Sequence, residues 1–150
     1  MLTLSKKILV AIDGSPQSDK AAEEAVRLAL VSGGKFKSTV YAVMVLPSAR
    51  APSFTEFFPS KPPTEEADWE EKRARVFYVV EKSAAEAQVS LESEVIYGDA
   101  AEEILNLAEQ KECDVIVIGS SGKGVMKRTL LGSVSTKVAL HARCSVYIVR

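Results

Sequence analysis

Apolar residues gather in short continuous runs along this chain, and the runs alternate with longer amphipathic segments. Residues 6–13, 38–46 and 114–119 are apolar with little alternation, a pattern typical of strands buried on both faces of a parallel sheet. Residues 90–98 alternate in part, and residues 144–150 form a last apolar run. These five runs predict five β-strands.

Segments with helical spacing lie between the predicted strands. Ser15 before Pro16 predicts the start of a first helix, because serine caps helix N-termini and proline suits the first helical position. A long helix is predicted over 64–88. Asp99 begins a D-x-x-E capping signal ahead of a third helix, and a fourth helix is predicted over 133–142.

The segment between the second strand and the long helix has a different composition. Residues 47–63 hold five of the six prolines and three of the five phenylalanines. Proline removes a backbone donor and interrupts regular structure, so a long loop is predicted here. Phe54, Phe57 and Phe58 either form a surface for an unknown protein partner or fold back over the core. Because no interdomain linker is evident, residues 1–150 are predicted to form a single domain.

The alternation of strands and helices predicts an α/β fold with three layers: an open, parallel, five-stranded sheet of Rossmann-like class with helices on both faces. Ligands of such sheets bind beyond the carboxyl ends of the strands, where the winding direction reverses. With strand order 3-2-1-4-5, the first and fourth strands straddle this point. Asp13, at the end of the first strand, then faces the stretch 114–133 across a crevice.

Composition and charge argue against several classes of protein. The chain has 150 residues and a net charge of −1 at pH 7, so it carries no basic field that would attract nucleic acid or a membrane surface. No apolar run approaches the roughly 18 residues of a membrane span, and the N-terminus lacks the residue order of a signal peptide. Cys113 and Cys144 are predicted to be packing residues, which favours a reduced, cytoplasmic setting.

Residues 114–133 carry the strongest signal for a binding site. They join a predicted strand to a helix N-terminus through a glycine-rich segment, and backbone N–H groups at such a terminus attract phosphate. The Walker pattern GxxxxGK[ST] and the dinucleotide pattern GxGxxG both fail here. Gly119 is predicted to turn the chain sharply with a positive φ. Gly122 is predicted to admit a phosphate because it lacks a Cβ atom.

The spacing of these glycines resembles a known motif. Residues 119–133 follow the pattern G-x2-G-x9-G-S, which is similar to the ATP-binding motif G-x2-G-x9-G-[ST] of the universal stress protein family. Residues 6–15 resemble the first strand of that family, and residues 130–149 resemble its closing helix and strand. The resemblance therefore covers the whole chain, and it implies a fold of the adenine nucleotide alpha hydrolase-like type.

The resemblance also implies roles for individual residues. In this family the motif glycines and the Gly-Ser pair wrap the phosphates with backbone N–H groups, an aspartate after the first strand holds the ribose, and backbone at the end of the second strand meets adenine. The implied nucleotide contacts in this chain are Ala11, Ile12, Asp13, Val45, Ile118, Gly119, Gly122, Gly132, Ser133, Val134 and Ser135. Met44 stands where many members carry a histidine, which would change the surroundings of the base.

This resemblance implies a cytoplasmic, ATP-binding regulator or switch of the stress response. No catalytic residue is assigned, because no general base lies among the implied contacts. Three alternatives stay open: a slow Mg-dependent ATP hydrolase in which Asp13 helps to hold the metal, a module that binds AMP or a cyclic nucleotide, and a protein-interaction scaffold with an empty pocket.

The last predicted strand, 144–150, also suggests how the protein assembles. This strand is apolar, and no later element covers its edge, which favours aggregation unless the edge is paired. The resemblance implies antiparallel pairing with the same strand of a second copy. A homodimer is therefore predicted, with Val146 and Ile148 near the two-fold axis.

Overall fold

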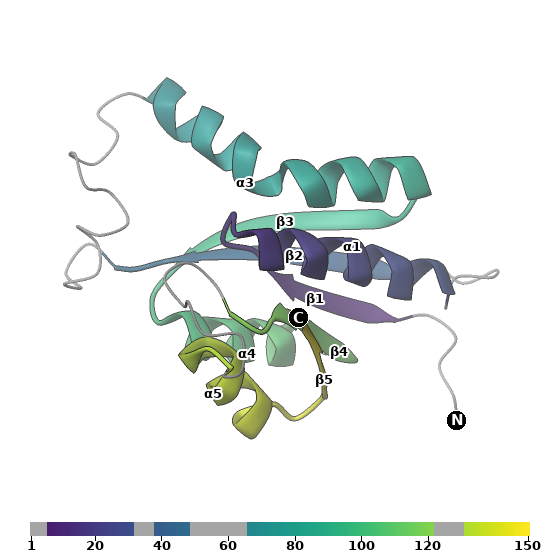
Figure 1. The fold of residues 1–150 in the computed structure, drawn as a ribbon, viewed down its shortest axis with the longest axis vertical. Helices are drawn as coiled ribbons and strands as arrows, with labels where there is room; N and C mark the ends of the chain where they lie inside the picture. Colours follow the sequence, from purple (N-terminus) through teal and green to yellow (C-terminus); the bar gives the residue numbers. More distant parts are fainter. Residues whose placement is uncertain (1–5, 32–37, 49–65, 122–130) are drawn as a thin grey trace.

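The computed structural model describes residues 6–31, 38–48, 66–121 and 131–150. Its centre is a sheet of five parallel strands in the order β3-β2-β1-β4-β5 (Figure 1). The strands are β1 (Lys7–Ala11), β2 (Thr39–Leu46), β3 (Ser90–Tyr97), β4 (Val115–Gly119) and β5 (Ser145–Val149). The predicted fold class and strand order are confirmed.

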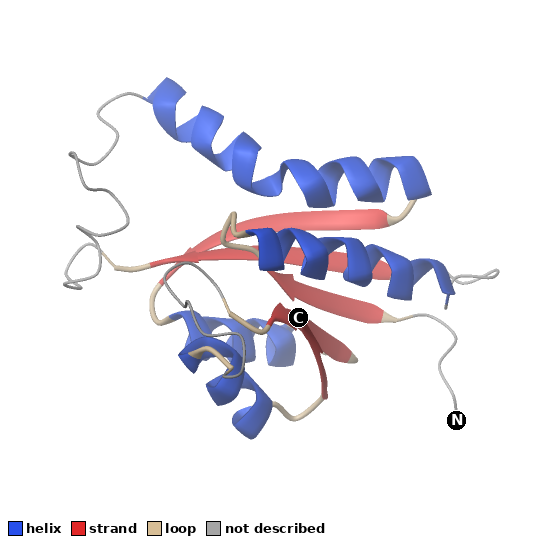
Figure 2. Ribbon diagram, viewed as in Figure 1, coloured by secondary structure: helices blue, strands red, loops and turns tan. Residues whose placement is uncertain are grey.

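Helices cover both faces of this sheet. The helices are α1 (Pro16–Val31), α3 (Glu66–Ala87), α4 (Ala100–Gln110) and α5 (Ser133–His141). Figure 2 shows α1 and α3 together on one face, and α4 and α5 together on the other. The molecule therefore has the three predicted layers, and the carboxyl ends of all five strands lie at the same end of the sheet.

Two helices begin with the side-chain caps that the sequence predicts. The Ser15 hydroxyl accepts a hydrogen bond from the Ser18 backbone N–H at 3.1 Å, ahead of α1. The Asp99 carboxylate accepts one from the Glu102 backbone N–H at 3.0 Å, ahead of α4. These side chains satisfy donors that the first turn of a helix leaves without an intrahelical partner. Gly132, ahead of α5, makes no side-chain cap, and this difference matters for the site below.

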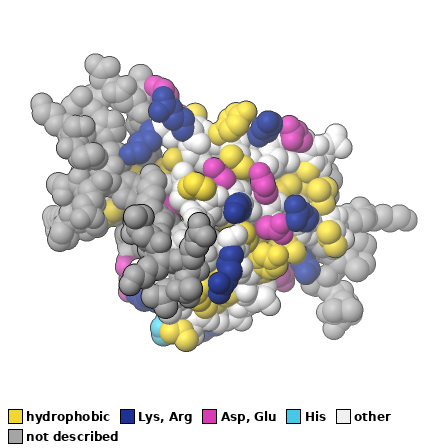
Figure 3. All heavy atoms as spheres, in the orientation of Figure 1, with side chains coloured by type: hydrophobic (Ala, Val, Ile, Leu, Met, Phe, Trp, Pro, Cys, Tyr) yellow, Lys and Arg dark blue, Asp and Glu magenta, His cyan; other side chains and the backbone are white. Residues whose placement is uncertain are grey.

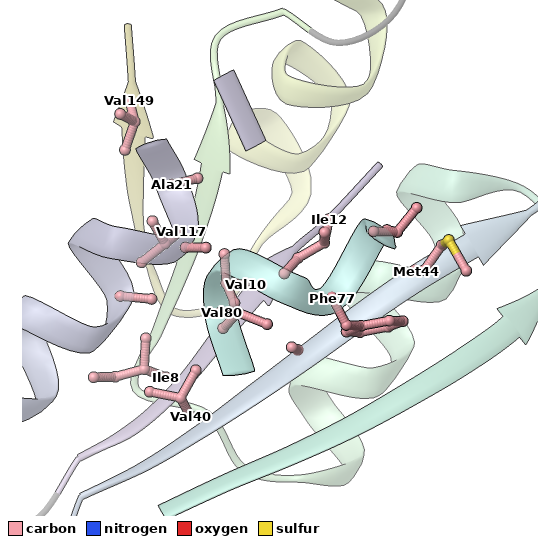
Figure 4. Packing of buried hydrophobic residues seen from close by; sticks show 14 of the residues in the cluster. Ile8, Val10, Ile12, Ala21, Val40, Met44, Phe77, Val80, Val117 and Val149 are labelled. Carbon is pink, nitrogen blue, oxygen red and sulfur yellow. The ribbon is translucent and has the colours of Figure 1, made fainter. Parts of the chain in front are cut away.

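The core has one apolar cluster on each face of the sheet. Ile8 and Val10 of β1 face α1 and α3, whereas Leu9 faces α4 and α5. All three side chains are fully buried, as expected for a central strand with helices on both sides. Figure 4 shows the first cluster, in which Phe77 of α3 packs with Met44 of β2.

The first strand is shorter than its apolar run. The sequence predicts a strand over 6–13, but β1 ends at Ala11. The Ile12 backbone N–H still donates to the Val43 carbonyl at 2.8 Å, and the chain then turns at Asp13. Asp13 therefore lies beyond the last hydrogen bond of this strand to the sheet, where it is available to a site.

The surface of the described residues mixes charges of both signs. In Figure 3, cationic, anionic and apolar side chains are interspersed over the face that carries α1 and α3. Within the described ranges, none of the helices is long and apolar enough to cross a membrane.

The predicted loop falls almost entirely within 49–65, so the loop and its three phenylalanines lie outside the described residues.

The two cysteines are free thiols that pack beneath α4 and α5. Burial, and to a smaller extent the charge of Cys144, raises the pKa of Cys113 from 9.0 to about 11. The folded state therefore holds this proton more tightly than the unfolded chain does.

This shift predicts a loss of stability at high pH. The contribution of Cys113 should be complete below pH 9.0 and should disappear as the pH rises to about 11. Urea unfolding of the wild type and of Cys113→Ala at several pH values checks this. The difference in unfolding free energy between the two proteins should shrink across that range, and a constant difference would contradict the assigned shift.

Candidate functional site

A pocket of ≈ 250 Å³ lies beyond the carboxyl ends of β1 and β4. This is the point at which the strand order reverses, and ligands of open α/β sheets bind there. Every predicted site residue that the structure describes lines it: Ala11, Ile12, Asp13, Val45, Ile118, Gly119, Gly132, Ser133, Val134 and Ser135. Gly122 lies outside the described residues. Residues far apart in the sequence are thus brought to one pocket.

A tight turn holds Asp13 in place at the start of α1. The Asp13 carboxylate accepts a hydrogen bond from the Ser15 backbone N–H at 2.8 Å, and the Asp13 backbone N–H donates to the Ser18 hydroxyl at 3.3 Å. Gly14 has a φ of 82°, a conformation that glycine adopts at little cost. The side chain of Asp13 is therefore oriented before any ligand arrives.

The carboxylate of Asp13 makes this side of the pocket negative. Burial, and then the charge of Asp13, raises the pKa of the nearby Asp19 carboxyl above its usual value. A carboxylate accepts hydrogen bonds from hydroxyl groups but repels phosphate. This part of the pocket thus suits a sugar hydroxyl better than an anion.

The opposite wall is the N-terminus of α5, which has an anion-binding character. Gly132, its N-cap, has φ −64° and ψ 162° and provides no side-chain cap, and the first turn of α5 contains no acidic residue. By contrast, Asp99 caps α4, whose first turn holds Glu102 and Glu103. Uncapped N–H groups and the positive end of the helix dipole attract anions. Of these two helix N-termini, only that of α5 suits phosphate.

Ser135 connects α5 to the end of β4. Its buried hydroxyl lies 2.9 Å from the Ser120 carbonyl oxygen and 3.0 Å from the Gly132 carbonyl oxygen. The Gly132 backbone N–H also donates to the Ser120 carbonyl, at 2.7 Å. The Ser135 side chain therefore fixes the position of the helix terminus, and its hydroxyl is already engaged by backbone carbonyls.

Gly119 has a different role from the one that the sequence predicts. Among the described residues, the glycines with positive φ are Gly14 and Gly98, so the expectation of a positive φ at Gly119 is wrong. Gly119 continues β4 and pairs with Val149. A Cβ atom added to it would lie 3.0 Å from the Gln17 Cβ and 3.2 Å from the Gln17 carbonyl carbon. Glycine is needed here because α1 approaches the strand closely.

The remaining part of the pocket is apolar and has backbone polar groups at its edge. Consecutive residues of a parallel strand direct their N–H and C=O groups toward opposite neighbours. Val43 accepts from Ile12, and Leu46 accepts from Gly98 beyond β3. The N–H and C=O of Val45 therefore point to the β1 side, where β1 has already ended. They present one donor and one acceptor to the pocket.

Helix α4 contributes two residues that the sequence analysis missed. Ala100 and Ile104 line the pocket, as do Ser15, Ser18, Val43 and Ser121. The Asp99 capping signal indicated where α4 begins, at the same end of the sheet, but it did not show that the first turn faces the pocket.

Met44 does not line the pocket, because its side chain packs in the cluster beneath α1 and α3. Met44 is therefore not part of the described pocket lining, and its effect on the surroundings of a base stays a prediction.

Among the described residues, the pocket contains neither a metal cluster nor a histidine. Within the described ranges, no group of three or more histidine, cysteine, aspartate or glutamate side chains could hold a metal ion. His141 lies in the last turn of α5 and does not line the pocket. Of the described pocket residues, Asp13 is the one with an acidic side chain, so it could supply one carboxylate ligand to a cation.

An open parallel sheet with a ligand pocket at its switch point defines the Rossmann-like class of α/β proteins. Within this class, the chain matches the model of the universal stress protein family over residues 5–150. The chain belongs to this family. It is 34% identical to the universal stress protein MJ0531 of Methanocaldococcus jannaschii, across 98% of this chain and 83% of that protein. It is also 34% identical to YxiE of Bacillus subtilis, across 96% and 98% respectively.

Solved structures of the family have the same fold. The universal stress protein UspA from Lactobacillus plantarum matches with a TM-score of 0.72 and 27% identity, across 99% of this chain and 100% of that one. A universal stress protein in complex with cAMP matches with a TM-score of 0.69 and 20% identity, across 99% and 98%. The Archaeoglobus fulgidus protein in complex with dAMP matches with a TM-score of 0.67 and 20% identity, across 99% and 100%.

Proposed function

We propose that the pocket binds an adenine nucleotide, and that the protein is a cytoplasmic, ATP-dependent regulator of the stress response. The observation that carries this proposal is the contrast between the two walls of the pocket. One wall is the uncapped N-terminus of α5 at Gly132, which suits phosphate, and the other holds the oriented carboxylate of Asp13, which suits a ribose hydroxyl. In a nucleotide, the phosphate and the free ribose hydroxyls are attached at opposite ends of the sugar, so each can face the wall that suits it.

The apolar end of the pocket suits the base. The side chains of Ala11 and Ile104 are apolar, and the N–H and C=O of Val45 offer a donor next to an acceptor. Adenine presents the complementary pair, since its N1 accepts and its N6 donates. The three parts of a nucleotide thus find three chemically matching regions in one pocket.

ATP is proposed over the alternatives because of the glycine spacing, and a persistent complex is expected rather than turnover. Binding of AMP or a cyclic nucleotide is the second candidate, supported by the related structures in complex with dAMP and cAMP. A slow Mg-dependent hydrolase would use Asp13 together with the phosphates as metal ligands. The same pocket supplies no second carboxylate from its described residues that could act as a general base.

The test is to identify the ligand and to measure its turnover. Mass spectrometry of the molecules released from the purified protein should find an adenine nucleotide, and calorimetry should show tighter binding of ATP than of AMP or cAMP. Phosphate release should be far below the roughly 1–10³ s⁻¹ of ordinary enzymes. Tighter binding of AMP or cAMP would support the second candidate, rapid phosphate release would support the hydrolase, and no binding at all would support the scaffold.

The edge of β5 supports the proposal of a homodimer. The Val149 carbonyl accepts from the Ser120 N–H, so Val149 faces β4. By alternation, Val146 and Ile148 direct their backbone groups away from β4, toward the outer edge of the described sheet. A second copy of β5, running antiparallel, would pair with these groups and remove the edge.

Light scattering is expected to show a dimer at micromolar concentration. Ile148→Pro should give a monomer, because it removes an outward N–H without removing a donor to β4. Ile148→Val, which keeps the N–H and a β-branched side chain, is the matched control and should remain a dimer. A monomeric wild type, or a dimeric Ile148→Pro, would contradict this pairing.

A further inference from the structure

Ion pairs join the α4 and α5 layer at its two opposite ends. At the pocket end, the Lys137 Nζ of α5 lies 3.5 Å from the Asp99 Oδ1 and 3.6 Å from the Glu102 Oε1. At the far end, the Arg143 Nε lies 3.3 Å from the Glu109 Oε1. The first contact is made by the N-cap and first turn of α4, and the second by its last turn. The two contacts therefore act on different ends of α4.

The pocket-end contact lies beside residues that line the nucleotide pocket. Ala100 follows Asp99 directly, and Ile104 lies one turn further along α4. Lys137 lies one turn after Ser133, which lines the pocket from α5. The Lys137 ammonium thus connects the first turn of α4 to α5 at the end of the layer that walls the pocket.

Helices α4 and α5 also pack directly on one another and share one apolar cluster, but their contacts with the sheet differ. Helix α4 packs against β2, whereas α5 packs against β5 at the edge. The N-cap and first turn of α4 also carry three carboxylates, Asp99, Glu102 and Glu103, which repel one another. A cation from α5 placed between two of them reduces this repulsion and favours one distance between the helices.

We propose that Lys137 is a positioning residue for the nucleoside half of the pocket. It holds the first turn of α4 against α5, and so it keeps Ala100 and Ile104 at the distance from β2 that suits a base. This proposal rests on the proposed function, because it assigns the base to the space between α4 and β2. Lys137 itself does not line the pocket.

Adenosine is the probe that distinguishes an effect of Lys137 on the position of α4 from direct attraction between its charge and a phosphate. Adenosine is neutral, so a loss of its affinity in a Lys137 variant reports the position of α4 and not attraction between the lysine and phosphate. Tripolyphosphate reports the α5 N-terminus alone, without the base. Calorimetric titration of both molecules therefore distinguishes the two halves of the pocket.

Lys137→Met should weaken adenosine binding by about 2- to 5-fold, the range of an exposed ion pair. Lys137→Glu should weaken it by about 10-fold, because a third carboxylate then repels Asp99 and Glu102. The double variant Lys137→Glu with Glu102→Lys should recover the wild-type affinity to within about 2-fold, since it restores an opposite-charge pair. Such rescue is not expected from a general loss of stability.

Arg143→Met is the matched control, because it removes the ion pair between the last turn of α4 and a residue just beyond the end of α5. It should leave adenosine affinity unchanged, and thermal midpoints without ligand should verify that each variant is folded. If Lys137→Met and Lys137→Glu bind adenosine as tightly as the wild type does, the positioning role is wrong while the proposed function stands. If the wild type itself binds neither adenosine nor ATP, the proposed function is wrong, and this inference is overturned with it.

Discussion

Gly119→Val is expected to lower the free energy of unfolding by about 3 kcal/mol, equivalent to a thermal midpoint about 6–12 °C lower. Even a single Cβ atom at this position would lie 3.0 Å from the Gln17 Cβ and 3.2 Å from the Gln17 carbonyl carbon and oxygen. Two of these atoms belong to the backbone of the first turn of α1, so no side-chain rotation relieves the contact. The helix would have to move away from β4. Urea unfolding without nucleotide measures the effect.

Gly132→Ala is the control for this prediction, because it changes another glycine of the same motif. A Cβ atom at Gly132 would meet the Ser120 carbonyl oxygen at 3.4 Å and the Ser121 Cα at 3.5 Å, which are ordinary contacts. Its φ of −64° also suits alanine. We expect a change of less than about 1 kcal/mol. Equal losses at both glycines would contradict the distinct packing role of Gly119.

Much of the fold could be predicted because local signals and tertiary structure agree. The unbroken apolar runs of β1, β2 and β4 require helices on both faces of the sheet, and the structure places helices on both. The caps at Ser15 and Asp99 act within a few residues of their own helices, so they can be recognised in the sequence. Alternation of strands and helices then leaves few possible topologies.

Other parts of the site could not be predicted, because they depend on which elements meet in space. The contact between Gly119 and Gln17 joins β4 to α1 and leaves no mark in the sequence near either residue. The two pocket residues of α4, Ala100 and Ile104, follow the pattern of an ordinary helix that packs against a sheet. Side-chain direction within β2 decides that Val45 faces the pocket while Met44 faces the opposite core.

The two helix N-termini at the pocket differ because their N-cap residues differ. Asp99 occupies one donor of α4, the Glu102 N–H, with its own carboxylate and makes this terminus negative, so α4 offers the pocket an apolar wall and not an anion site. Gly132 leaves the donors of α5 without such a side chain. One helix terminus can therefore serve the base and the other the phosphates, although both helices start at the same end of the sheet.

Ala100→Trp is expected to weaken adenine-nucleotide binding by at least about 100-fold, which corresponds to about 3 kcal/mol. Ala100 is the first residue of α4 and its side chain lines the pocket, so an indole there should occupy the space assigned to the base. The change lies at a half-exposed helix terminus and not in the core, so the unfolding midpoint without nucleotide should move little.

Asn106→Trp is the matched control for this substitution, because it introduces the same side chain on an exposed position of α4 that does not line the pocket. With ATP at about 100 times the wild-type Kd, the ligand should stabilise the wild type and the control by about 2.7 kcal/mol, but Ala100→Trp by only about 0.4 kcal/mol. Thermal unfolding with and without ATP measures all three proteins. Undiminished stabilisation of Ala100→Trp by ATP would mean that the base does not lie between α4 and β2, because no adenine could share that space with an indole.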